Sequence, residues 1–233
     1  MPTSNSLLIE IPFVLNFSNL EFDKVIIFIV AVLLSVTVNA EAQAFMATVL
    51  GDIKDDAKDR FHFNPLFHIN LAGLICFAVA GFGWSRQIEI NTSKFKHPAI
   101  AVMIVKCAGA FANLLLASIA ASILFIMKKW NLEDQVFSIV VAVNIMVFVY
   151  NSVPVPPLAG AYILFSIISA FLPTSFLNLL FANTKTINFN RYFIRITPYI
   201  FVGVLIVMKI NGLALFNETL YPVVRAIFQF IAG

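Results

Sequence analysis

The sequence predicts an all-α polytopic membrane protein with about six transmembrane helices and one broken or re-entrant proline-rich segment. Of its 233 residues, 61% are hydrophobic and 12% are charged, and the mean hydropathy is +0.93. A soluble domain carries about 25% charged residues, so this composition points to the bilayer. The net charge of +3 is spread along the chain without a basic block, and we therefore expect no nucleic-acid partner.

Six apolar runs come close to the roughly 20 residues that a membrane span needs. The first is entered at Lys24 and left at Gly51-Asp52, and Lys128-Lys129 stop the third. The expected spans are 24–50, 66–84, 98–127, 135–151, 157–172 and 193–210. Two flanking segments, 7–17 and 213–231, are expected at the membrane interface.

We expect one membrane domain over residues 1–233, with a core at 24–172 and C-terminal helices at 173–233. Lysine and arginine are slightly more frequent in loops 51–65, 128–134 and 173–192, which are therefore assigned to the cytoplasm. The expected location is the inner (cytoplasmic) membrane of a bacterium, with several passes.

Several polar side chains fall inside the predicted spans. Glu41 is the most costly, because a carboxylate at mid-membrane costs several kcal/mol. We expect Asn113, Asn144 and His68 to form hydrogen bonds within the helix packing. Lys106 is either a cationic partner for Glu41 or a side chain that snorkels to the interface.

The segment NSVPVPPLAG, residues 151–160, places three prolines between two apolar runs. Proline removes a backbone donor and breaks helices. Backbone freed in this way is tolerated at membrane depth only where protein or a water-filled cavity covers it. A broken helix beside an intramembrane carboxylate indicates a site.

Five blocks of the sequence, in order, resemble those of the site-2 protease family of intramembrane zinc metalloproteases. Asn39–Ala44, followed by Leu50-Gly51-Asp52, lies where the family has HExxH and a Leu-Gly-Asp exit. The other four resemble Asn-Pro-Leu-x-His-x-Asp, Gly-Trp-x-x-Pro-Val-x-Val-Asn, Ala-Gly-Pro-x-Ala-Asn and Asn-x-x-Pro-x-Pro-Pro-Leu-Asp-Gly. In the same order, these four blocks of the present sequence are Asn64–Asn70, Gly83–Asn91, Ala108–Asn113 and Asn151–Gly160. The likeness covers most of residues 24–172 and implies a site-2-protease-like core there.

The departures from the family pattern fall on the metal ligands. In active members two histidines and an aspartate hold zinc, and the glutamate acts as general base on the bound water. The resemblance places these ligands at Ala40, Ala44 and Ala159, whose methyl groups donate no lone pair. Only the vestigial base, Glu41, remains. The vestigial groove comprises Asn113, Asn151, Pro154, Pro156 and Pro157.

We expect no metal and no cofactor, because no other residues replace the lost ligands. Metal ligands on one helix are spaced at i and i+3 or i+4, and His62 and His68 are not. His97 lies in a different loop. Cys76 and Cys107 are each alone in an apolar run and are expected to be small core residues.

The absence of ligands predicts a protein that is not an enzyme. We expect an inactive pseudoprotease that acts as a structural or accessory subunit and binds other integral membrane proteins, in a hetero-oligomeric complex, and lipids. Drift at Asn70, Gln87 and Ala110 favours natural loss of the ligands. The alternative is an intramembrane zinc metalloprotease captured as a zinc-ligand variant, which the natural residues at positions 40, 44 and 159 would reveal. A carrier or proton path through Glu41 would need more titratable groups in line.

Overall fold

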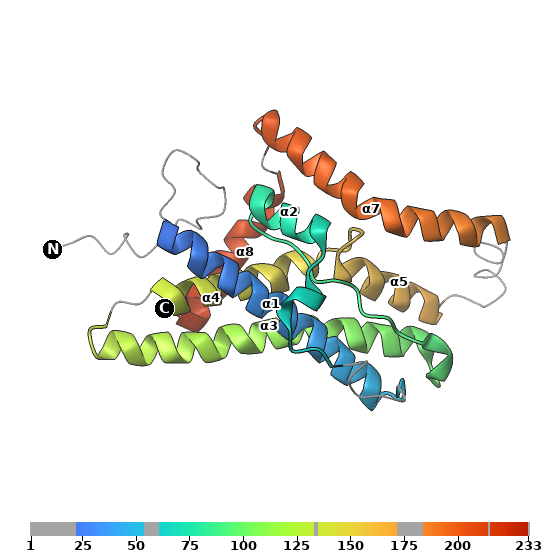
Figure 1. Cartoon of the computed structure of the whole chain (residues 1–233), viewed down its shortest axis with the longest axis horizontal. Helices are drawn as coiled ribbons and strands as arrows, with labels where there is room; N and C mark the ends of the chain where they lie inside the picture. The colour runs from blue at the N-terminus through green and yellow to red at the C-terminus, as the bar shows by residue number, and fades with distance from the viewer. Residues whose placement is uncertain (1–21, 54–60, 133–134, 172–183, 214, 233) are drawn as a thin grey trace.

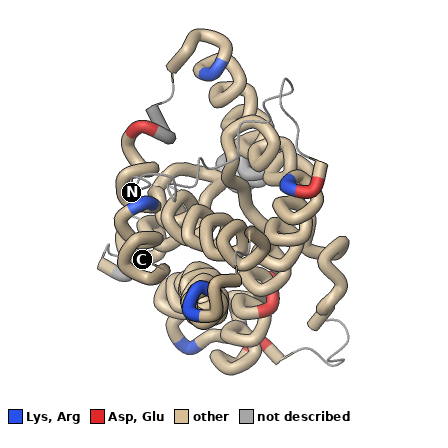
Figure 2. The backbone as a smooth tube through the Cα atoms, turned by 90° about the vertical axis from the view of Figure 1, so that its left-hand side faces the viewer, with Lys and Arg blue, Asp and Glu red and all other residues tan. Residues whose placement is uncertain are grey.

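The computed structural model describes residues 22–53, 61–132, 135–171, 184–213 and 215–232 (Figure 1). In these ranges the chain is helical, and its sole β-type pairing is an isolated antiparallel bridge between Ile69 and Ser85. The expectation of an all-α protein is therefore confirmed for the described residues. Charged residues are sparse along the backbone tube, where long stretches carry none (Figure 2).

Among the described residues, two helices are long and apolar enough to cross a membrane, and both were predicted. They are α1 (Phe22–Val49) and α3 (Pro98–Lys129). At about 1.5 Å per residue, each exceeds the roughly 30 Å hydrocarbon core. Lys128 and Lys129 lie in the last turn of α3, where cations interact favourably with the helix dipole. These helices support assignment as a membrane protein.

Helix α4 (Gln135–Asn151) forms the centre of the bundle and packs against both α1 and α3. Its buried residues surround the helix rather than forming one stripe, which is typical of a central helix. The small residue Gly109 lets α3 approach α1 closely, because a Cβ there would lie 2.8 Å from Gln43 Nε2. Small residues at helix contacts allow this kind of close approach in membrane proteins.

The second predicted span, 66–84, is wrong as a single helix. The chain instead forms a 3₁₀ turn, η2 (Pro65–His68), and a short helix, α2 (Leu71–Ala80). The Asn70 side chain caps α2 at Gly73 N, and Gly81 ends it in a left-handed conformation with φ 81°. Ten residues extend only about 15 Å, which is too short to cross the bilayer.

The remaining predicted spans are helical but do not confirm a count of six. The bounds of α4 agree with the prediction, and α5 (Ala159–Phe171) falls within the predicted 157–172. Helix α7 (Thr184–Ile210) includes the predicted 193–210, and α8 (Leu215–Ala232) includes most of 213–231. α7 runs along the edge of the molecule opposite α3 (Figure 1). The interfacial segment predicted at 7–17 lies outside the described residues.

Candidate functional site

The three positions that the resemblance assigns to zinc ligands lie on two helices. Ala40 and Ala44 are buried on α1, with 0% and 2% of their surface exposed, and Ala159 begins α5. Glu41 follows Ala40 on the same helix and is 8% exposed. The carboxylate is therefore held inside the protein, as the sequence predicted.

Glu41 binds the segment that precedes α2. Its Oε1 accepts a hydrogen bond of 2.7 Å from His62 N and lies 3.0 Å from His68 Nε2. Nε2 of His68 also contacts the carbonyl oxygen of His62. The second carboxylate oxygen, Oε2, is buried and has no hydrogen-bond partner within the described chain. Sequence reasoning missed this cluster, because it depends on residues 61–68 folding back onto α1.

Two features place His68 at Glu41: the cap of η2 and the extended segment around Arg86. The Asn64 side chain caps η2 by accepting from Leu66 N, and Pro65 favours the first helical position. On its other side, His68 O accepts a hydrogen bond of 2.7 Å from Arg86 N. Because these contacts fix the backbone at His68, the imidazole is held in position next to Glu41.

A second polar network joins α1, α3 and α4 beneath this cluster. Asn39 Nδ2 donates to Asn113 Oδ1 at 2.7 Å, and Asn113 Nδ2 donates to Asn144 Oδ1 at 2.9 Å. Gln43 Nε2 donates to Asn39 Oδ1 at 2.7 Å. The hydrogen bonding expected of Asn113 and Asn144 is thus present. These bonds fix the rotation of α1 about its axis, and hence the direction in which Glu41 points.

Lys106 belongs to this network and does not pair with Glu41. Its ammonium donates to Gln43 Oε1 at 3.0 Å and also to Gln87 Oε1. The same nitrogen lies 5.1 Å from the centre of the Tyr162 ring on α5, a cation–π distance. Of the two alternatives for Lys106, pairing with Glu41 is therefore wrong, since amide oxygens and an aromatic face surround the cation.

The proline-rich segment between α4 and α5 is a break in the helix, as predicted. It includes a cis peptide bond between Pro156 and Pro157. Asn151 Nδ2 donates at 2.9 Å to both Gly83 O and Val147 O, which ties the end of α4 to the extended segment before Ser85. The structure does not test the groove role predicted for these residues.

Gly160 allows α5 to start close to the end of α4. A Cβ on this residue would lie 2.2 Å from Ser152 O and 2.5 Å from Val153 O, both backbone atoms. We expect Gly160→Ala to lower the free energy of unfolding in detergent by about 3 kcal/mol, because the backbone would have to shift. Gly203→Ala on α7 is the control, since a Cβ there meets nothing within 4 Å. Equal losses from both variants would contradict the close packing.

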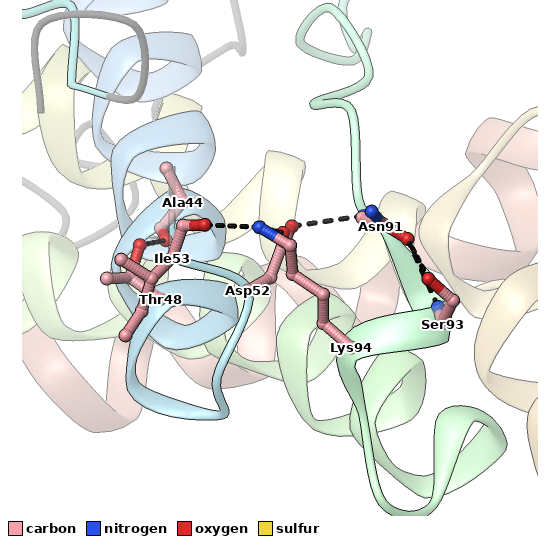
Figure 3. A network of polar contacts seen from close by, with 7 residues as sticks. All are labelled: Ala44, Thr48, Asp52, Ile53, Asn91, Ser93 and Lys94. Carbon is pink, nitrogen blue, oxygen red and sulfur yellow. Dashed lines mark hydrogen bonds and ion pairs between the residues drawn. The ribbon is translucent and has the colours of Figure 1, made fainter. Parts of the chain in front are cut away.

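The residues that follow α1 are bonded to the segment around Asn91 and Lys94 (Figure 3). The carboxylate of Asp52, 1% exposed, accepts a hydrogen bond of 3.0 Å from Asn91 N and lies 3.9 Å from Lys94 Nζ. One turn earlier, Thr48 Oγ1 donates to Ala44 O at 3.0 Å. The Leu-Gly-Asp block and the block ending at Asn91, far apart in sequence, therefore meet.

The residues at the family's ligand positions do not fit a zinc ion. Alanine methyl groups offer no lone pair, whereas a catalytic zinc takes three protein ligands. Within the described ranges, no group of three or more His, Cys, Asp or Glu side chains is placed to hold a metal. No chemical step is therefore assigned to a metal at positions 40, 44 and 159.

The chain is similar to a metalloprotease. Over 141 residues it is 36% identical to a protein of Bacillus subtilis (strain 168) named "Putative zinc metalloprotease YwhC". The match covers 57% of this chain and 64% of that protein, which is less than two thirds of the relative's length. No protein-family model matches the chain, and no solved structure matches it.

This relative overturns the expectation that the chain is not an enzyme. That expectation depended on three alanines, whereas the similarity extends over 141 residues and points to protease activity. The inactive accessory role has no support of its own. The 36% identity to a protein named as a zinc metalloprotease, together with the ordered sequence blocks, supports a site-2-protease-like family for this chain.

Proposed function

We propose that this chain is an intramembrane metallopeptidase of the site-2-protease type that carries alanine at the zinc-ligand positions. The single observation that carries the proposal is the 36% identity to a protein named as a zinc metalloprotease. The substrate class would be a membrane-anchored polypeptide. The integral membrane proteins expected as partners would then be its substrates. The chain itself would be a multi-pass protein of the bacterial inner membrane.

The described residues support a role for Glu41 as the base. Its Oε1 is held by His62 N, which fixes the carboxylate, while Oε2 has no partner among the described residues. An oxygen of this kind is suited to accept the proton of an attacking water. A carboxylate that lies within hydrogen-bond reach of the water proton it removes raises the rate of reaction by about 10²–10⁴-fold.

The loop before α5 would form the substrate-facing side. Pro154 and Pro156 are exposed, whereas Pro157 and Leu158 are buried and anchor the segment. Asn151 connects this loop to the backbone at Gly83. We therefore place the polypeptide along the exposed side of the proline segment, at Pro154 and Pro156 and beside Ala159.

The test is to return the ligands. The triple variant Ala40→His, Ala44→His and Ala159→Asp, reconstituted in liposomes with a membrane-spanning reporter peptide, is expected to cleave it. The chain as it stands is expected to cleave the same peptide at least about 10²-fold more slowly, because no zinc held at positions 40, 44 and 159 activates a water beside Glu41. A matched control returns only Ala40→His and Ala44→His, which leaves the third ligand missing. Failure of the triple variant to cleave any of a panel of membrane peptides would contradict the proposal.

A further inference from the structure

Three lone-pair donors converge at one point beside the family's ligand positions. They are the Glu41 carboxylate, Nε2 of His68 and the carbonyl oxygen of His62. Glu41 and His68 are 8% and 7% exposed, so the cluster is enclosed by protein. Neither histidine has a zinc-binding role in the pattern on which the resemblance depends.

The separation of His68 Nε2 and Glu41 Oε1 fits a shared metal ion. His68 Nε2 and Glu41 Oε1 are 3.0 Å apart. Two ligand atoms that each lie about 2.0–2.2 Å from one metal are roughly 3 Å from each other. A nitrogen and an oxygen at this separation are therefore able to bind the same ion with little movement.

Hydrogen bonding alone leaves the cluster incompletely satisfied. The Nε2 atom of His68 faces two acceptors, Glu41 Oε1 and His62 O, but a neutral imidazole offers at most one N–H there. The Oε2 atom of Glu41 is buried and finds no partner among the described residues. A buried polar atom without a partner costs about 1–3 kcal/mol, and a cation would satisfy both carboxylate oxygens.

We propose that this chain binds one divalent metal ion through Glu41, His68 and the His62 carbonyl oxygen. Imidazole with carboxylate and carbonyl oxygen suits a borderline ion, and Zn²⁺ is the best match. The inference goes beyond the proposed peptidase function, because it gives the chain as it stands a metal site separate from positions 40, 44 and 159. In this arrangement Glu41 is a ligand. Glu41 would act as the base only once ligands are restored at those three positions.

The backbone around His68 is already held in place, so binding needs little reorganisation. Arg86 N donates to His68 O, and the adjacent residue Ile69 pairs with Ser85. Asn70 caps α2 immediately afterwards. Preorganisation of this kind lowers the free-energy cost of binding.

The experiment measures Zn²⁺ binding by the full chain, purified in detergent and stripped with a chelator. We expect one saturable site per chain, and at least about tenfold weaker binding in His68→Ala. Glu41→Gln is the second variant, because its amide oxygen still accepts the hydrogen bond from His62 N while the anionic ligand is lost. His97→Ala is the matched control, since it removes an exposed imidazole from a different loop.

Zn²⁺ binding is read without proteolysis, so this inference and the proposed function can fail separately. Two results would overturn the inference. One is no saturable Zn²⁺ binding, which would leave a His68–Glu41 hydrogen bond only. The other is equal affinity in Glu41→Gln, His68→Ala and His97→Ala, which would show adventitious surface binding.

Discussion

In the variant with histidine at 40 and 44 and aspartate at 159, replacing Glu41 with glutamine is expected to lower kcat by about 10²–10⁴-fold. The physical reason is loss of the base, because an amide oxygen does not take the proton of an attacking water. Glutamine has nearly the same shape and still accepts the hydrogen bond that His62 N gives to Oε1 at 2.7 Å. The fold should therefore survive. The measurement is the initial rate of cleavage of a membrane-spanning reporter in liposomes.

Two comparisons make this prediction specific. Glu218→Gln on α8 removes an exposed carboxylate of the same kind and is expected to leave kcat unchanged. Both variants are compared in the His68→Ala background, in which the site at Glu41 and His68 is lost. Zinc content should then be equal in both variants, so that a loss of rate reports on chemistry and not on metal. An unchanged rate in Glu41→Gln would mean that another group acts as base.

The second large effect is expected at Asn113, which is 0% exposed. Its amide joins α3 to two other helices, α1 and α4: Oδ1 accepts from Asn39, while Nδ2 donates to Asn144 Oδ1 at 2.9 Å and to Ser35 Oγ at 2.8 Å. In Asn113→Leu, a donor on Asn39 and an acceptor on Asn144 would remain buried without partners. Each such group costs about 1–3 kcal/mol, so we expect a loss of roughly 2–4 kcal/mol in the free energy of unfolding.

Ser118→Ala is the matched control on the same helix. Among the described residues, the hydrogen-bond partner of Ser118 Oγ is Leu114 O on the same helix, so its removal is expected to change stability by less than about 0.5 kcal/mol. Unfolding in mixed detergent micelles, followed by circular dichroism, measures both variants. Losses of similar size in the two variants would contradict the view that Asn113 joins helices. The loss expected at Asn113 exceeds the average of about 0.6 kcal/mol for a single interhelical hydrogen bond in membranes, because this amide makes several such bonds.

The long helices could be predicted because their signals are local. An apolar run that ends at Gly51 or at Lys128-Lys129 defines its own length, and α1 and α3 follow these signals closely. The span predicted at 66–84 failed for a reason that is also local. Asn70 and Gly81 act as caps within a run that is apolar enough to pass as one helix. Hydropathy does not detect side-chain caps or a left-handed glycine.

The site could be predicted only in part. That Glu41 and Asn113 would be buried followed from their places in apolar runs, and both are. The contact of His68 with Glu41, 27 positions away in the sequence, depends on how residues 61–70 fold back and has no local signal. For Lys106 the sequence left open a pair with Glu41 or a side chain that snorkels, and the structure instead places the side-chain amides of Gln43 and Gln87 at its ammonium.

The error about enzyme activity has a different origin. Three ligand positions were weighed as if they decided the function of the whole chain. Similarity over 141 residues to a protein named as a zinc metalloprotease carries information from many more positions. Loss of ligand atoms at Ala40, Ala44 and Ala159 changes what these three positions bind, whereas the similarity extends over 141 residues.

The most direct test of the proposed peptidase is the zinc content of the ligand-restored chain in the His68→Ala background. This background removes the second set of ligands inferred here, so that the count reports only on positions 40, 44 and 159. We expect about one zinc per chain after chelator treatment and dialysis, because catalytic zinc needs three protein ligands. Reverting any one of positions 40, 44 and 159 to alanine should remove most of the bound zinc. A restored chain that holds no more zinc than its alanine parent would contradict the account.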